Sequence, residues 1–424
     1  MSNILSVYQN IPTKGGNHLM YIRQMSLFSF EDIIDFQQES KLDMILDQID
    51  VSGLTSALRK SSDSRGPKGF DPTNMICSLI AMQILRINRI SELVSQLKAN
   101  PVLRYTCGFK VIGRVPSEST FSRFINKISD SSVLEDLFTK LVEKANALKL
   151  VDGEHISIDS TKLGSFEASR PKKKIIEDGS NPNWGMKRDT NGNNIRWFGW
   201  KLHIICDSKS ELPLDIMVTP ANVYDGTVAV TMIESFLEKF QSRFKPKYYA
   251  MDSGYDFEYV YDDIINKFNA IPIIAYNPRG SKSSPEGLDE DFNPLCSGGF
   301  KLSYWGKDGD YLKFRCPHAT GKINCPHGMN WCSSSNYGYT VKLGYKENPR
   351  QYGYPLRAST EWKLQYNLRT SVERCNSRLK EGLNLDHVRS KGIKKVKTHA
   401  LLNCIALIAG TIVSNIQREK KKAA

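Results

Sequence analysis

The chain has 424 residues, of which 40% are hydrophobic and 24% are charged, so it is long enough for two or three domains with their own cores, and wholesale disorder is excluded. Its 58 Lys and Arg against 45 Asp and Glu give a net charge of +13. This excess favours a polyanionic partner, because each neutralised phosphate releases counterions, although proteins that are merely soluble share it.

Two features predict a cytosolic setting. No charged start followed by an apolar core marks the N-terminus, so no secretory signal is expected. Nine cysteines, an odd number unevenly spread along the chain, then favour a reduced compartment over a disulfide framework.

Residues 1–150 are expected to form a helical domain. Apolar residues recur at helical spacing in residues 29–49 and 71–109, where Asp71 before Pro72 is typical of a helix start. Ser117 or Ser119 is the expected N-cap of a further helix. Helices with Arg and Lys at their ends could seat one helix in a DNA groove; a helical packing or dimerisation domain is the alternative.

After residue 150 the pattern changes to strands. Residues 154–164 alternate, with Ile156 and Ile158 on one face and Asp159 on the other. The pattern then predicts two strands in residues 197–221, a helix in 225–240, a strand in 246–256, a helix in 257–269 and a strand in 270–278. This α/β order suits a mixed sheet whose first three strands form a meander and whose later strands join through helical crossovers.

The remaining residues are predicted to form an insertion and two helices. Residues 278–359 are rich in Gly, Ser, Asn, Tyr and Cys and have no long helical period, which favours a mostly β or irregular insertion. A long helix containing residues 366–380 follows. The apolar run 400–416 is broken by polar residues such as Asn403, so it predicts a buried helix that packs on the sheet and no membrane span.

Three carboxylates are predicted to meet at one edge of this sheet. Asp159 is expected at the end of the first strand, Asp252 ends the fourth, and Glu373 on the following long helix can supply a third. Such a site, without histidine, suits Mg²⁺ or Mn²⁺, and two ions about 4 Å apart can activate water and stabilise the leaving oxygen of a phosphodiester. Turn and cap roles are the alternative for acids at strand ends, and we expect them for Asp225 and Asp256.

Residues 366–380 place four polar side chains on one stripe of a helix. At about 100° per residue these side chains fall within roughly 60° of one another; they are Tyr366, Arg369, Glu373 and Lys380. A solvated helix usually scatters its charges or pairs opposite signs four residues apart, so one acid among bases indicates a site. Local pairing of Arg369 and Lys380 with Glu373 is the alternative, and it does not explain Tyr366.

These motifs resemble the DDE transposases of bacterial insertion sequences, in the group whose third acid lies in a Y-(2)-R-(3)-E-(6)-K signature. Residues 366–380 match that signature at every spacing. The segments IDST at 158–161 and MDSGYD at 251–256 resemble the strands of the first and second acids. Residues 199–226 are similar to the stretch between those acids, and residues 69–124 resemble the family's N-terminal domain.

The resemblance implies a ribonuclease H-like catalytic fold, a mixed α/β sheet with flanking helices, interrupted by an insertion. The expected domains are a helical domain for DNA binding or dimerisation (1–150), the catalytic domain (151–277 and 360–424) and a Cys-rich insertion (278–359). Catalysis and metal binding are implied for Asp159, Asp252 and Glu373. DNA contacts are implied for Tyr366, which could stack on a base, and for Arg369 and Lys380, which could bind phosphates.

The implied reaction cuts a phosphodiester at each insertion-sequence end and transfers the freed 3′-hydroxyl to target DNA, with two Mg²⁺ or Mn²⁺ ions. The implied partner is double-stranded DNA, at transposon ends and target, with no membrane, and the location is the cytoplasmic nucleoid of a bacterium. A homodimer is expected because two ends must be cut and joined together. A catalytically silent DNA-binding protein of transposase descent and a ribonuclease H-like nuclease without end preference remain alternatives.

A second group of candidate ligands lies in the insertion. Within 37 residues the chain contains Cys296, Cys316, Cys325 and Cys332, together with two histidines in a repeated Cys-Pro-His motif. Four soft ligands could bind a structural Zn²⁺ and stabilise a segment too irregular to form its own core. No CxxC pair is present, so buried or idle thiols are the alternative.

Residues 169–189 are expected to form a long basic loop between the first two strands, near the predicted acid edge. DNA contact and a solvated, mobile loop are both compatible with its composition.

Overall fold

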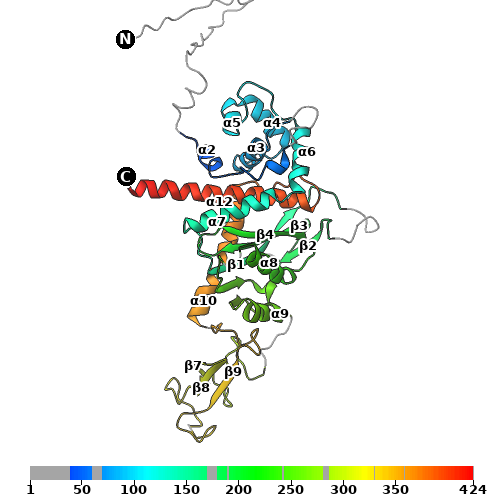
Figure 1. Cartoon of the computed structure of the whole chain (residues 1–424). Coiled ribbons are helices and arrows are strands. Elements are labelled where there is room, and N and C mark those ends of the chain that lie inside the picture. Colours follow the sequence, from blue (N-terminus) through cyan, green and yellow to red (C-terminus); the bar gives the residue numbers. More distant parts are fainter. Residues whose placement is uncertain are drawn as a thin grey trace, which may run out of the picture.

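The computed structural model describes residues 39–59, 69–169, 179–188, 191–240, 243–279, 286–328, 330–357 and 359–423. These residues form an elongated molecule, with the N-terminal helices at one end, a mixed sheet in the middle and a small second sheet at the other end (Figure 1).

The N-terminal part is helical, as the sequence predicts. Its helices are α2 (Lys41–Leu46), α3 (Pro72–Ile84), α4 (Ile90–Ala99), α5 (Pro101–Thr106), α6 (Glu118–Ser129) and α7 (Val133–Ala147). The Asp71 side chain accepts a hydrogen bond from Thr73 N at the start of α3, with Pro72 in the first helical position. Ser117, rather than Ser119, caps α6. Residues 29–38 of the first predicted helix lie outside the described residues.

The central sheet has the predicted mixed topology. Its strands are β1 (His155–Gly164), β2 (Asn183–Arg188), β3 (Asn194–Asp207), β4 (Pro213–Pro220), β5 (Tyr248–Met251) and β6 (Ile271–Ile274). The antiparallel strands β4, β3 and β1 form a meander, and β5 and β6 continue it in parallel. This β4-β3-β1-β5-β6 order is ribonuclease H-like, which confirms the fold class.

Strand β2 corrects the expectation of a loop over residues 169–189. Residues 183–188 pair antiparallel with the first half of β3, and Gly185 lies so close to Trp197 that an added Cβ would come within 2.5 Å of the ring. The sequence signal for β2 is weak because this short, polar strand forms only by pairing with β3. The rest of the expected loop, at residues 170–178 and 189, falls outside the part of the chain that is described.

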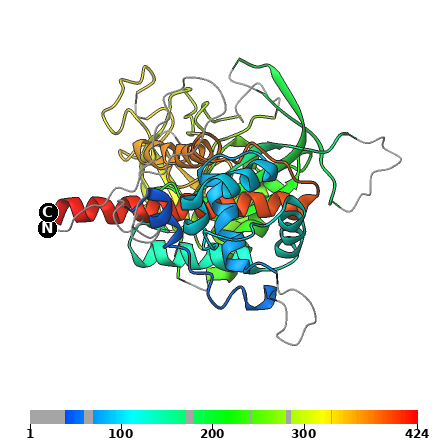
Figure 2. The same ribbon diagram turned by 90° about the horizontal axis from the view of Figure 1, so that it is seen from above.

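Helices pack around this sheet. Helix α8 (Asp225–Phe240) contacts β1, β3 and β4, and the short α9 (Glu258–Asp262) leads into β6 through a π-helical turn. Helix α12 (Ile393–Ala423) contacts β4 and also α3, α6 and α7, so it lies between the sheet and the N-terminal helices (Figure 1 and Figure 2).

Helix α12 is long and apolar enough to cross a membrane, but 67% of its most apolar window is buried inside the structure. Its buried face, from Val396 to Val413, belongs to one apolar core shared with the sheet and the N-terminal helices. The helix is therefore a core element, as predicted.

The predicted long helix over residues 366–380 is interrupted. It consists of α10 (Thr360–Asn367), α11 (Thr370–Ser377) and a π-helical turn at residues 378–382. Between α10 and α11 the backbone tightens: Arg369 N bonds to Tyr366 O, Ser371 N bonds to Leu368 O, and Ser157 Oγ on β1 also donates to Leu368 O at 3.2 Å. A side chain inserted into the helical hydrogen-bond ladder is a known cause of such a break.

The insertion is mostly β or irregular, as predicted. Strands β7 (Ser303–Asp308), β8 (Tyr311–Arg315) and β9 (Thr340–Gly344) form a small antiparallel sheet. Its fully buried apolar cluster is small: Leu302, Leu312 and Phe314.

Candidate active site

The sheet register brings two predicted acids side by side. Strands β1 and β5 pair in parallel, with Ile158 opposite Met251 as the last pair. The next residues along the two strands are Asp159 and Asp252, so the two acids lie side by side where β5 ends. This placement follows from the strand order, because β1 and β5 are neighbours in the sheet and run parallel. Strand β1 itself continues to Gly164, which corrects the expectation that Asp159 ends its strand.

Both carboxylates are partly buried and close enough to repel each other. Burial, and then the negative charge of Asp252, raise the pKa of Asp159 to about 7, although Asp159 Oδ1 accepts a 2.7 Å hydrogen bond from Ser160 N. Burial also raises the pKa of Asp252, helped by the charges of Asp225 and Glu373 and opposed by the hydrogen bond from Gly254 N. Negative charge at this edge is therefore incompletely compensated.

Glu373 approaches the pair from α11, which contacts β1 and β3. About half of its side chain is exposed, and its Oε1 lies 2.9 Å from Arg369 Nη1. The charge of Glu373 raises the pKa of Asp252, and the charge of Arg369 lowers the pKa values of Asp159 and Asp252. The third acid and the arginine thus lie in the same electrostatic neighbourhood as the two aspartates.

The other residues of the predicted stripe have different surroundings. Tyr366 stacks on Trp362 with ring centroids 4.7 Å apart, and the Arg369 guanidinium lies 5.6 Å from the Tyr366 ring. Lys380 pairs with Asp386 at 3.1 Å and donates to the Lys162 carbonyl at 3.0 Å. Local pairing with Glu373 therefore holds for Arg369 and not for Lys380.

A fourth acid, Asp225, lies near this edge, where the sequence predicts only a turn or cap role for it. Asp225 is the first residue of α8, and its charge raises the pKa values of Asp159 and Asp252. Lys201 Nζ lies 3.0 Å from Asp225 Oδ1, and buried His203 Nδ1 lies 3.7 Å from the same oxygen. The alternation of Lys201 and His203 on β3 was the available signal, because it places two basic side chains on one face of the strand.

A buried tyrosine, Tyr255, lies within range of the charges of these acids. Tyr255 follows Asp252 in a short turn, and its hydroxyl has no hydrogen-bond partner among the described residues. Burial, and then the charges of Asp225 and Asp159, raise the pKa of this hydroxyl. A buried hydroxyl without a partner is costly, so it marks a place where a further polar group would be stabilised.

Asp256 does not belong to the cluster. Its carboxylate is fully buried and accepts hydrogen bonds from Arg350 at 2.9 Å, Tyr261 Oη at 2.9 Å and Asn277 N at 2.8 Å. Asp256 is the C-cap of the turn Ser253–Tyr255, as expected, and its side chain also forms a buried ion pair with Arg350. Because Arg350 follows β9, this pair ties the end of the insertion to the sheet.

The donor set of the acid cluster fits a divalent cation. Mg²⁺ and Mn²⁺ prefer carboxylate oxygens. Burial, and then the charge of Asp252, raise the pKa of Asp159, and a bound cation would offset both effects. Arg369 supplies positive charge next to the acids and would contribute to holding an anionic phosphate there.

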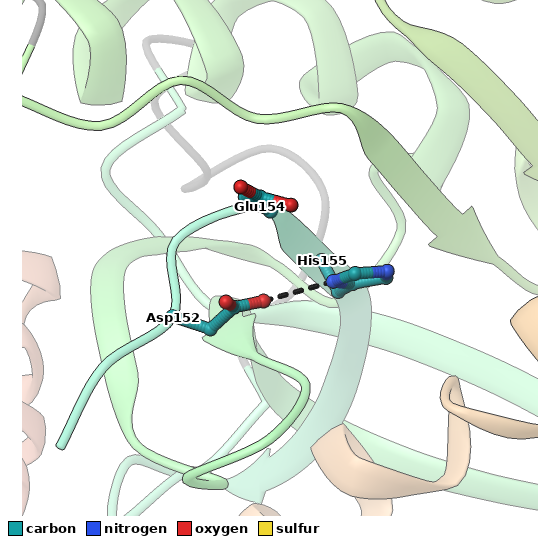
Figure 3. Close-up of side chains that lie close together, drawn as sticks. All are labelled: Asp152, Glu154 and His155. Atoms are coloured by element: carbon teal, nitrogen blue, oxygen red, sulfur yellow. Dashed lines mark hydrogen bonds and ion pairs between the residues drawn. The ribbon is translucent and has the colours of Figure 1, made fainter. Parts of the chain in front are cut away.

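A second group of possible metal ligands lies at the start of β1. Asp152, Glu154 and His155 have ligand atoms within 4.8 Å of one another (Figure 3). Asp152 already binds His155 Nδ1 at 2.8 Å and Lys209 Nζ at 3.0 Å, and these two bonds lower its pKa against the effect of burial. His155 lies four residues before Asp159, about 13 Å along an extended strand. We interpret this group as an ion-pair cluster at the start of β1.

Two family models match the chain. Residues 150–409 match the model described as "Transposase DDE domain", and residues 28–127 match "Transposase domain (DUF772)". No curated protein matches the chain significantly. Among solved structures, the chain is similar to the "Cryo-EM structure of piggyBac transposase synaptic complex with hairpin DNA (SNHP)", with 13% identity, 90% of this chain and 75% of that chain covered, and a TM-score of 0.40.

Proposed function

This chain belongs to the DDE transposase family, and we propose that Asp159, Asp252 and Glu373 are the carboxylates with which it cuts and joins DNA. Membership makes the protein a DNA transposase that uses divalent metal; the residues, the number of ions and the route are our proposal. The observation that carries it is the register of β1 and β5, which sets Asp159 beside Asp252 within the electrostatic reach of Glu373.

The three acids would hold two Mg²⁺ or Mn²⁺ ions. When bound, these ions supply the positive charge that lowers the pKa of an attacking water or hydroxyl and stabilises the leaving oxygen. Asp159 and Asp252 are fixed by the sheet, whereas Glu373 is half-exposed and paired with Arg369. Engagement of Glu373 with the ions would release Arg369 to bind a phosphate next to the scissile bond.

The signature residues around Glu373 would bind the DNA. Tyr366, already stacked on Trp362, offers an aromatic surface for a base. Arg369, one turn before Glu373, and Lys380, about two turns after it, would bind phosphates, and Lys380 would exchange its contact with Asp386 for one of them. The proposed DNA is double-stranded, at the transposon ends and the target.

The proposed route has two phosphoryl-transfer steps, a hydrolysis and then a strand transfer. Water attacks the phosphodiester at a transposon end, and the leaving 3′-oxygen takes up a proton to become a hydroxyl. That 3′-hydroxyl then loses its proton and attacks a target phosphodiester, which joins the strands and releases the target's own 3′-hydroxyl. A homodimer would align two ends, and the bacterial nucleoid is the proposed site of action.

The test is end cleavage and strand transfer on labelled duplexes taken from the DNA that flanks the gene. We expect Mg²⁺-dependent cleavage that requires the flanking inverted repeat, and joining to plasmid DNA. Asp159→Ala should abolish both, whereas Asp262→Ala, at an exposed acid on α9, should leave both intact.

Other outcomes would contradict the proposal. DNA binding without cleavage by the unmodified protein indicates the catalytically silent descendant. Cleavage of any duplex without preference for the repeat indicates a ribonuclease H-like nuclease. Activity retained in Asp159→Ala would remove Asp159 from the reaction.

A further inference from the structure

The insertion has a poor hydrophobic core for its size. Three short strands bury one cluster of Leu302, Leu312 and Phe314. Between β8 and β9 the described residues form no helix or strand. Small domains with so little buried apolar surface commonly depend on a disulfide or a metal for stability.

Four cysteines gather in this part of the chain. Cys316 directly follows β8, and its N–H donates to Tyr339 O just before β9, so it sits at the base of the segment that carries Cys325 and Cys332. Cys296 is partly buried and packs against the cluster of Leu302, Leu312 and Phe314. All four thiols are free of disulfide bonds.

The turns that carry Cys296 and Cys325 lie next to each other. A Cβ added to Gly298, two residues after Cys296, would lie 3.7 Å from the ring of His327, two residues after Cys325. Among the described residues these thiols do not form a group within 4.8 Å of one another. Metal binding would therefore draw the segment between β8 and β9 closed.

The backbone repeats one tight turn at two of these cysteines. Gly299 N donates to Cys296 O at 2.8 Å, and Gly328 N donates to Cys325 O at 3.1 Å. Both glycines have left-handed backbone angles, φ +76° and +73°, which favour glycine at these positions. A Cys followed by a Gly three residues later, in the same turn, therefore occurs at both Cys296 and Cys325.

A third glycine makes room for Cys316. A Cβ added to Gly338 would come within 2.9 Å of the Cys316 Cβ, and Gly338 also has a left-handed φ of +83°. The chain thus passes close to Cys316 as it returns to β9. Three of the four cysteines therefore lie next to a glycine with a left-handed φ.

We propose that Cys296, Cys316, Cys325 and Cys332 bind one structural Zn²⁺ that folds the insertion. Four thiolates are a soft, tetrahedral set that suits Zn²⁺, with no change of oxidation state. Each thiol passes its proton to solvent as its sulfur binds the ion, so binding releases up to four protons.

The nearby histidines are assigned other roles. His318 Nδ1 accepts a hydrogen bond from Cys325 N at 3.2 Å, and the His327 ring stacks on Trp331 at 4.3 Å. Both rings are therefore engaged in contacts that support the turns around the cysteines.

The first test is the zinc content of the full-length protein, measured by elemental analysis after purification without chelators. One Zn²⁺ per chain is expected, and a metal-free sample should take up one equivalent of added Zn²⁺. Cys296→Ser combined with Cys332→Ser should lose the zinc, whereas Cys77→Ser on α3 is the matched control and should keep it. Failure to take up Zn²⁺, or zinc retained by the double variant, would overturn the proposal.

Two further measurements separate this site from the catalytic one and from an oxidised alternative. Asp159→Asn should keep its zinc, and removal of zinc should speed proteolysis within residues 286–357 while α12 remains protected. Co²⁺ substitution should give the visible absorption of a tetrahedral thiolate site. Disulfides among these four cysteines in the protein as isolated, detected by mass spectrometry, would overturn the proposal.

Discussion

Asp252 and Asp256 lie four residues apart on the segment after β5, yet their surroundings are opposite. The fully buried Asp256 is matched by Arg350, Tyr261 and the Asn277 N–H. The partly buried Asp252 accepts a hydrogen bond from Gly254 N and faces the charges of Asp225 and Glu373, with Arg369 as the opposing cation.

The difference separates structure from function. A buried carboxylate with its partners in place stabilises the fold only as long as the partners remain. Carboxylates gathered without enough positive charge destabilise the fold until a cation binds, and such a cost is typical of a functional site. Charge compensation, rather than burial, therefore distinguishes these two aspartates.

The largest expected effect is on catalysis. Asp252→Asn should lower the rate of strand transfer at least about a thousandfold, because it removes a carboxylate proposed to hold the metal ions. Its melting temperature should not fall, since the substitution relieves repulsion. Strand-transfer assays and thermal melting measure both effects, with Asp262→Asn as the control; activity within tenfold of the unmodified protein would contradict the assignment.

Next in size is the effect on stability at Asp256. Asp256→Ala leaves Arg350 without its carboxylate and should lower the free energy of unfolding by about 3–5 kcal/mol. Urea denaturation measures this loss. Adding Arg350→Met should recover part of it, because the double variant no longer buries an unpaired charge; strictly additive losses would show that the ion pair does not couple the two residues.

A smaller effect should appear in the pH dependence of the metal-free protein. The folded pKa of Asp159, about 7, lies above the ordinary value of 3.8, so the folded state binds this proton more tightly than the unfolded state. Stability from this group is fully present below pH 4 and is lost as the pH rises to about 7. Melting temperatures in chelator at pH 5 and pH 8 should therefore differ more in the unmodified protein than in Asp159→Asn.

Added Mg²⁺ or Mn²⁺ sharpens this comparison. At pH 8 either ion should raise the melting temperature of the unmodified protein and have little effect on Asp159→Asn. An equal rise in both proteins would indicate that the ion binds elsewhere, for instance near Asp152.

The smallest expected effect concerns the break between α10 and α11. Ser157→Ala removes the donor to the Leu368 carbonyl and contacts with Ser208 and Ser371. We expect a loss of about 1 kcal/mol in unfolding free energy and a few-fold slower strand transfer, because Glu373 is less firmly positioned. Ser414→Ala on the exposed side of α12 is the control, and unchanged activity would show that the break does not position Glu373.

The sequence by itself determined the alternating strands, the helix caps at Asp71 and Ser117, the order of the elements apart from β2 and the break after α10, and the prediction of Asp159, Asp252 and Glu373 as the acids. These depend on periodicity, on local hydrogen bonding and on spacing along the chain, all of which a single sequence contains. The resemblance to transposases in residues 366–380 is also readable from the sequence, because the signature consists of residue types at fixed spacings.

Only the tertiary structure decided the pairing of β2, the break at Leu368, the charge of Asp225 beside the acids and the burial of Asp256 against Arg350. Each depends on groups far apart in the sequence: Ser157 reaches Leu368, and Arg350 returns from beyond the insertion to Asp256. Whether an acid is compensated is decided by such distant partners, because charges act through space and the fold alone sets which charges become neighbours.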